Sequence, residues 1–169
     1  EDHVAAVDKI KSKFNSIIIG YSQDNQIPKP DQTVDEGQIF EIHDQKYEVI
    51  HTPGHTLQHI NYFIKEHNIL FSGDTLFNAG CGRMFEGDPK MFWESLLKIK
   101  SLPLDTKIYC GHEYTLSNIK FALSIDPDNQ NLKKLADWAN QQEDEHRPTI
   151  PTTLKEQTLC NPFLRCDSE

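Results

Sequence analysis

The sequence predicts an α/β fold that carries a metal site at one edge of its sheet, followed by a small helical domain. Two apolar runs typical of strands end at a glycine that precedes a candidate ligand, in Ser72-Gly73-Asp74-Thr75 and in Cys110-Gly111-His112-Glu113. The turn Thr52-Pro53-Gly54-His55 offers a third ligand, and Asp2-His3 stands at the start of the chain. Imidazole and carboxylate groups on four separate loops are typical of a catalytic metal site.

The length and charge of the chain limit its possible functions. A chain of 169 residues corresponds to one domain, or to one domain with a small appendage. The net charge of -9 argues against a general nucleic-acid or membrane-surface role. An anionic substrate stays possible, because a metal and a few arginines reverse the local field. No apolar run approaches the roughly 18 residues that a membrane span needs.

The cysteines indicate a reducing compartment. Four are present, with no C-x-x-C spacing: Cys81, Cys110, Cys160 and Cys166. Cys110 follows an apolar run, so we expect a buried free thiol there. Unpaired thiols suit a reducing environment, and we expect the protein in the cytoplasm.

The elements of the first domain follow from apolar spacing and from turn residues. Val4, Val7 and Ile10 share one helical face, which predicts a helix after Asp2-His3. Residues 22–38 are polar and rich in turn residues, so they read as a loop with room for one short strand. Short apolar runs bounded by turn residues predict strands, which we place at 17–19, 39–42, 47–50, 60–64, 69–71 and 107–110. The second and third of these strands form a hairpin.

Helices predominate towards the end of the chain. Asp88 and Pro89 are suited to the cap and first position of a helix whose apolar face includes Phe92 and Leu96. Residues 115–147 predict two helices, the first ending before Pro127, and a proline-rich tail follows. We therefore place a metal-binding domain at 1–113 and a helical domain at 114–169.

The chemistry of the candidate ligands favours hydrolysis. A metal held by imidazoles and carboxylates lowers the pKa of water towards about 7, which supplies hydroxide at neutral pH. Asp74 is the one carboxylate placed between histidine loops, as a residue that bridges two ions would be. Taken singly, His55 is also explained as a turn residue and Asp74 as a cap. His59 reads as support for the ligands or as a core histidine, and solvated positions explain His43, His51, His67 and His146.

Three longer motifs strengthen this interpretation. They are Phe71-Ser72-Gly73-Asp74-Thr75-Leu76-Phe77 continuing into Ala79-Gly80-Cys81-Gly82-Arg83; Tyr109-Cys110-Gly111-His112-Glu113-Tyr114-Thr115; and a helical tail with Pro148-Thr149 and Asn161-Pro162-Phe163-Leu164-Arg165. With Asp2-His3 and His55, they resemble the metallo-β-lactamase superfamily and, within it, the hydroxyacylglutathione hydrolases (glyoxalase II). The resemblance covers essentially the whole chain. It implies an αββα sandwich, N-terminally incomplete here, followed by the helical domain.

The resemblance also implies roles for the ligands. Asp2, His3 and His112 would bind a second metal ion, His55 would bind the first, and Asp74 would bridge both. Asp2 and Asp74 would be the catalytic residues, and two divalent ions the cofactors, with zinc preferred over iron or manganese. The family motif H-x-H-x-D-H is represented only by Glu1-Asp2-His3. We therefore expect this chain to hold at most one ion firmly and to show little thioesterase activity.

The implied substrate is a small-molecule glutathione thioester. Arg83 and Arg165 match family positions that bind glutathione carboxylates, and Tyr114 matches a tyrosine beside the glutathione. Phe85 stands where some members place a second tyrosine, which removes a hydroxyl contact. The expected reaction is hydrolysis of an S-(2-hydroxyacyl)glutathione, such as S-lactoylglutathione, by a monomer that binds neither nucleic acid nor membrane.

Other functions remain open at this point. A persulfide dioxygenase of the same superfamily is one, although the helical tail ending at Arg165 argues against it. A non-catalytic fragment that binds glutathione or a partner protein is another, and the absent H-x-H favours it. A lactonase or nuclease is a third, and the acidic charge disfavours the nuclease.

Overall fold

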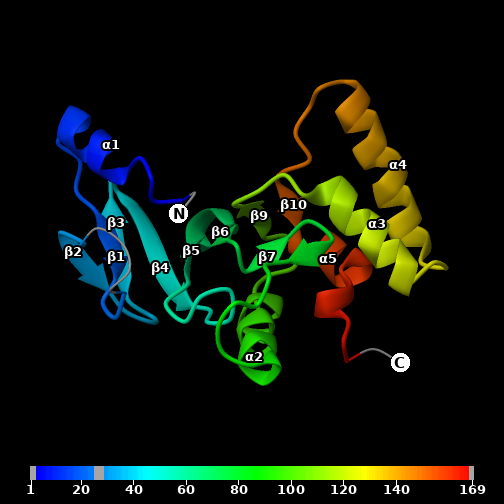
Figure 1. The fold of residues 1–169 in the computed structure, drawn as a ribbon, viewed down its shortest axis with the longest axis horizontal. Helices are drawn as coiled ribbons and strands as arrows, with labels where there is room; N and C mark the ends of the chain where they lie inside the picture. Colours follow the sequence, from blue (N-terminus) through cyan, green and yellow to red (C-terminus); the bar gives the residue numbers. More distant parts are fainter. Residues whose placement is uncertain (1–2, 25–28, 168–169) are drawn as a thin grey trace.

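The structure is a computed structural model of the 169-residue chain, and it describes residues 3–24 and 29–167 (Figure 1). Its elements in chain order are α1 (Val7–Phe14), β1 (Ile19–Tyr21), β2 (Gln32–Val34), β3 (Ile39–Ile42), β4 (Gln45–His51), β5 (Ile60–Ile64), η1 (Lys65–His67), β6 (Ile69–Gly73), β7 (Leu76–Phe77), β8 (Gly80–Cys81), α2 (Pro89–Lys100), β9 (Lys107–Cys110), α3 (Thr115–Ile125), α4 (Gln130–Asp144), β10 (Thr152–Thr153), α5 (Leu154–Cys160) and η2 (Pro162–Leu164).

A six-stranded sheet in the order β10-β9-β6-β5-β4-β3 organises the fold. Its pairs are antiparallel except β6 with β9, which run parallel with Leu70 opposite Ile108. The register of that parallel pair shifts between Phe71 and Gly73. Because parallel strands end at the same edge of a sheet, the residues that follow β6 and β9 emerge side by side.

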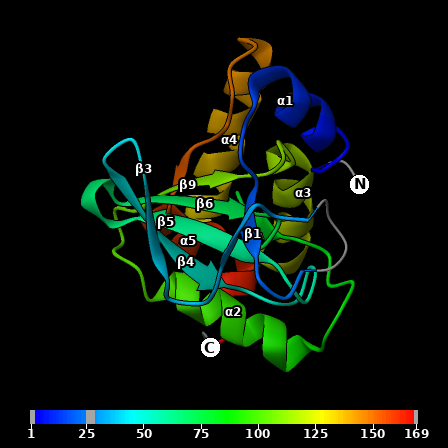
Figure 2. The same cartoon turned by 90° about the vertical axis from the view of Figure 1, so that its left-hand side faces the viewer.

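One face of the sheet forms the main core. Ile50, Phe63, Leu70 and Ile108 alternate with outward residues along β4, β5, β6 and β9, and they bury their side chains in one cluster. Helix α2, which lies below the strands in Figure 2, adds Leu96 and Ile99 to that cluster, and the C-terminal segment adds Leu154 and Leu164. The opposite face carries aromatic rings that are only partly covered: Phe40, Tyr47, Tyr62, Phe71 and Tyr109.

The C-terminal helices gather beside β9 and β10 (Figure 1). Helices α3, α4 and α5 share a second apolar cluster that includes Ile119, Leu132 and Cys160. Ala79, from the turn between β7 and β8, is fully buried in the same cluster. The helical segment is therefore packed directly on the loop that follows Asp74. None of the helices in the described part of the chain is long and apolar enough to cross a membrane.

Most elements were predicted from the sequence, with local differences. The helix after His3, the 39–50 hairpin, the strands at 60–64 and 107–110 and the Asp88 cap are confirmed. The strand predicted at 17–19 was misplaced, since it begins at Ile19 and Ile17 is 65% exposed. Strand β10 and helix α5 were not predicted, and they occupy the predicted proline-rich tail.

The cysteines and histidines also differ in part from expectation. All four cysteines are free. Cys110, predicted to be buried, is only partly buried, and this partial burial raises the pKa of its thiol. The prediction of a solvated His51 was wrong. Its ring stacks on Tyr21, with 4.5 Å between centroids, and Nε2 donates to the backbone oxygen of Leu57 at 2.7 Å. The stacking of Tyr21 on His51 links β1 to the end of β4.

The start of α5 offers a test of the missed helix. The Thr153 hydroxyl accepts from the backbone N–H of Glu156, and the Glu156 carboxylate accepts from the backbone N–H of Thr153. Thr153→Ala removes one half of this capping box and should lower the free energy of unfolding by about 1 kcal/mol. Urea denaturation measures the change. Thr158→Ala, which removes only a hydroxyl bond to the Lys155 carbonyl, serves as control, and equal stability of the two variants would contradict the capping role.

Candidate metal centre

The two ends of the parallel strand pair supply two of the predicted ligands. Asp74 follows β6 and His112 follows β9, and the Gly111 N–H donates to the Gly73 oxygen at 2.8 Å. A Cβ on Gly111 would lie 2.4 Å from Asp74 Oδ1, so only glycine allows the loops to come this close. His3 reaches the same place from the segment before α1.

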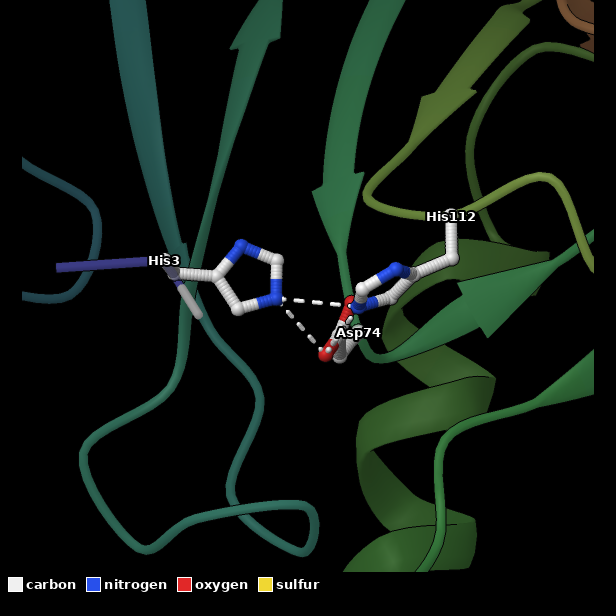
Figure 3. A group of neighbouring side chains, drawn as sticks. All are labelled: His3, Asp74 and His112. Carbon is white, nitrogen blue, oxygen red and sulfur yellow. Dashed lines mark hydrogen bonds and ion pairs between the residues drawn. The ribbon is translucent and has the colours of Figure 1, made fainter. Parts of the chain in front are cut away.

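The imidazoles converge on one carboxylate oxygen. His3 Nε2 lies 3.0 Å from Asp74 Oδ2, and His112 Nε2 lies 3.4 Å from it. The two imidazole nitrogens are 3.2 Å apart. Figure 3 shows all three side chains pointing toward one another, and their ligand atoms lie within 4.8 Å of one another. Three ligand groups at this spacing surround a volume suited to one metal ion.

The second oxygen of Asp74 is the observation that points to a cation. Asp74 is 5% exposed, yet Oδ1 has no hydrogen-bond partner among the described residues. Burying a carboxylate oxygen without a partner costs a large desolvation energy, unless a positive charge compensates it. The side chains present therefore fit a divalent ion at Asp74.

His55, in the loop between β4 and β5, lies close to the same carboxylate. Its Nε2 lies 3.4 Å from Asp74 Oδ2, while Nδ1 lies 2.9 Å from the backbone oxygen of Arg83. A carbonyl only accepts, so Nδ1 carries the proton and Nε2 has the lone pair that a metal requires. His55 thus reaches the carboxylate as predicted, although only His3, Asp74 and His112 form the tight group of three.

His59 holds the backbone of the Asp74 loop through a hydrogen bond. The Asp74 N–H donates to His59 Nε2 at 3.0 Å, so Nδ1 carries the proton and lies 3.0 Å from the Thr75 hydroxyl. Burial, followed by the nearby His55, lowers the pKa of His59 to about 4, which keeps the ring neutral. Gly73 adopts φ +48°, and a Cβ there would lie 2.8 Å from the His59 ring. A side chain at position 73 would therefore collide with the His59 imidazole.

Sequence reasoning did not identify the threonines that complete this support. Thr52 and Thr75 are fully buried, and their hydroxyls are 2.8 Å apart. The Thr52 hydroxyl also lies 3.3 Å from His59 Nδ1. Their positions in the sequence could have identified them, because Thr52 and Thr75 each belong to a motif that carries a ligand.

The predicted substrate residues lie in different surroundings. Tyr114 is 47% exposed and stacks on His112, with 4.7 Å between ring centroids and 8° between planes. The Arg83 guanidinium lies 5.8 Å from the ring of Phe85, which meets the His55 ring edge-on. Arg165 donates to the Asp126 carboxylate, and this bond lowers the pKa of Asp126. Asp2 lies outside the described residues.

Arg83 also lines a cleft. It measures about 660 Å³ and runs between Arg83, Trp93 of α2, Phe121 of α3 and Cys166 near the chain end. Its walls are mostly apolar, with one guanidinium at Arg83. The cleft is therefore bordered by aromatic rings and by one positive charge.

Comparison with known proteins adds a family to this geometry. Residues 1–112 match the metallo-β-lactamase superfamily, and residues 113–169 match the hydroxyacylglutathione hydrolase C-terminus. A hydroxyacylglutathione hydrolase of Chelativorans sp. (strain BNC1) is 49% identical over 98% of this chain and 65% of its own length. One from Pelagibacter ubique (strain HTCC1062) is 43% identical over 99% of this chain and 71% of its own length. The chain thus spans about two thirds of the length of these relatives.

Solved structures agree on the fold. The BLEG-1 B3 metallo-β-lactamase superposes with a TM-score of 0.69 at 22% identity, covering 96% of this chain and 72% of that one. The α/β unit with a helical C-terminal segment, predicted from the sequence, is confirmed by these matches. The chain belongs to the metallo-β-lactamase superfamily and, within it, to the hydroxyacylglutathione hydrolases.

Proposed function

We propose that the protein is a thioester hydrolase that cleaves S-(2-hydroxyacyl)glutathione to glutathione and a 2-hydroxy acid. The buried Asp74 carboxylate, approached by three imidazoles, is the observation that carries this proposal. Relatives up to 49% identical named hydroxyacylglutathione hydrolase support a hydrolase rather than a persulfide dioxygenase. S-lactoylglutathione is the substrate that we propose, which would give the protein a role in methylglyoxal detoxification.

The superfamily implies divalent metal ions, and the ligand set fits them. His3 and His112 would hold one ion, His55 the other, and Asp74 would contact both. We assign Asp2 to the same site by family resemblance, and we propose zinc, with iron or manganese as alternatives that nitrogen and oxygen ligands also accept. When bound, the ions would supply hydroxide at neutral pH and positive charge for the thioester oxygen.

The side chains of the protein prepare this chemistry by holding fixed positions. His59 holds the backbone of Asp74, and the Arg83 carbonyl fixes the tautomer of His55. Tyr114 stacks on His112 and Phe85 meets the His55 ring edge-on, so each aromatic ring restricts the orientation of one ligand imidazole. In the reaction, a water oxygen bonds to the acyl carbon, the carbon–sulfur bond breaks, and the leaving thiolate takes up a proton.

Recognition of the glutathione part falls to the positive groups near the cleft. Arg83 and Arg165 would bind carboxylates, and Tyr114 would contact the peptide. Arg165 already pairs with Asp126, so substrate would compete with an internal carboxylate for the guanidinium. We also propose that the substrate-binding domain spans 114–169, with the metal-binding domain at 1–113, in a cytoplasmic monomer.

Loss of the central carboxylate tests the metal chemistry. In a protein that also carries the two histidines of the H-x-H motif, Asp74→Ala should remove bound zinc and lower turnover of S-lactoylglutathione by more than the roughly 10–100-fold that loss of an outer-sphere partner costs. Metal analysis and steady-state kinetics measure both effects. Asp137→Asn, an exposed change on α4, provides the control. Turnover and zinc content of Asp74→Ala near those of this control would contradict the proposal.

The pairing of Arg165 gives a separate test of substrate binding. Arg165→Ala should raise KM about 10- to 100-fold with little change in kcat, because a carboxylate contact of roughly 1.5–3 kcal/mol is equal in ground and transition states. Asp126→Asn removes the competing carboxylate and should lower KM. Arg147→Ala, which removes an exposed ion pair with Glu145, should leave KM unchanged. A fall in kcat alone would refute the assignment of Arg165.

A further inference from the structure

A single residue of the C-terminal segment contacts both loops that carry metal ligands. Thr149 lies between α4 and β10 and is 6% exposed. Its N–H donates to Glu113 Oε1 at 3.1 Å, and its hydroxyl donates to Glu113 Oε2. The same hydroxyl lies 2.5 Å from the Thr115 hydroxyl. Glu113 and Thr115 flank Tyr114, directly after His112, so Thr149 fixes the loop that presents this imidazole.

The carbonyl of Thr149 reaches the other loop. It accepts a hydrogen bond from Asn78 Nδ2 at 3.1 Å. Asn78 is 1% exposed and stands in the turn between β7 and β8, four residues after Asp74. Its side-chain oxygen accepts from Gln157 Nε2 at 2.8 Å, and the Gln157 oxygen accepts from the Ala79 N–H at 2.8 Å. All three polar groups of Thr149 are therefore used, toward two different ligand loops.

The hydrogen bonds of Thr149 lie beyond the ends of β6 and β9, where strand pairing no longer restrains the backbone. The ladder between β6 and β9 ends at the pair Gly73 and Cys110, before either ligand. Beyond it, the Gly111 N–H to Gly73 carbonyl bond links the loops directly. The glycines that allow close approach also leave the backbone free to rotate. Hydrogen bonds to a charged carboxylate are stronger than those between neutral groups, so the two bonds from the buried Thr149 to the exposed Glu113 restrain the His112 loop.

We propose that Thr149 is a positioning residue for the metal centre, which sets the spacing of Asp74 and His112 by holding both loops to one point of the helical segment. This inference rests on the proposed function, because it concerns how tightly the same ligands hold a metal. It gives the segment 114–169 a role in metal binding in addition to substrate recognition.

Substitutions of Thr149 separate positioning from general stability. Thr149→Val keeps the shape and the backbone groups but lacks the hydroxyl, whereas Thr149→Ser keeps the hydroxyl. Thr106→Val is the matched control, because the buried Thr106 hydroxyl has no hydrogen-bond partner among the described residues. Zinc affinity is measured by competition with a chromophoric chelator, kcat and KM with S-lactoylglutathione, and the free energy of unfolding on metal-free protein.

We expect Thr149→Val to weaken zinc binding by roughly 10–100-fold and to lower kcat while KM stays the same. Thr149→Ser should retain wild-type affinity. If Thr149→Val fails to fold, Glu113→Gln weakens the same contact from the side of the His112 loop and should also lower zinc affinity. Zinc affinity of the folded Thr149→Val or Glu113→Gln protein equal to that of Thr106→Val would overturn the inference, even if unfolding became easier.

The wild-type measurements distinguish this inference from the function on which it rests. If a wild-type protein that also carries the two histidines of the H-x-H motif binds zinc but does not hydrolyse the thioester, the proposed function fails, while weaker zinc binding by Thr149→Val still supports positioning. If the wild type hydrolyses the thioester and Thr149→Val binds zinc normally, positioning alone fails. A wild-type chain that binds no zinc overturns both.

Discussion

The parallel pairing of β6 with β9 is the constraint on which the rest of the site depends. It brings the residues after two strands, about 40 positions apart in sequence, to one edge of the sheet. Gly73 and Gly111 then allow both backbones to turn within hydrogen-bonding distance of each other. The backbone itself thereby places a buried carboxylate and an imidazole together, so a bound ion need not gather distant groups at an entropic cost.

A second level of order surrounds the ligands. The neutral His59 ring, two buried threonine hydroxyls and the packing of Gly73 hold Asp74 from inside the sheet. From outside, the β7–β8 turn and the C-terminal segment enclose the same loop. Such partners set the direction of each ligand, and so they tune metal affinity without touching the metal.

Loops and elements that depend on local sequence patterns were predicted, whereas features that depend on contacts between distant residues were missed. The ligand loops at His55, Asp74 and His112 were found because strand-like runs end there at glycine. Helix α5 was missed because it is short and bounded by Pro151 and Pro162, so its stability depends on burial of Leu154 and Gln157. The partner of Arg165 was missed because Asp126 lies 39 residues away. The threonines around His59 were missed because their contacts with the imidazole join loops that only the folded sheet brings together.

Ala79 has a consequence for the integrity of the chain. This residue of the β7–β8 turn is fully buried in the apolar cluster to which α3, α4 and α5 contribute, although it belongs to the sequence region of the sheet. The boundary between the two sequence families therefore does not divide the hydrophobic interior. Separating the helices would expose the alanine and its neighbours to solvent, so the two regions should melt together in one cooperative transition.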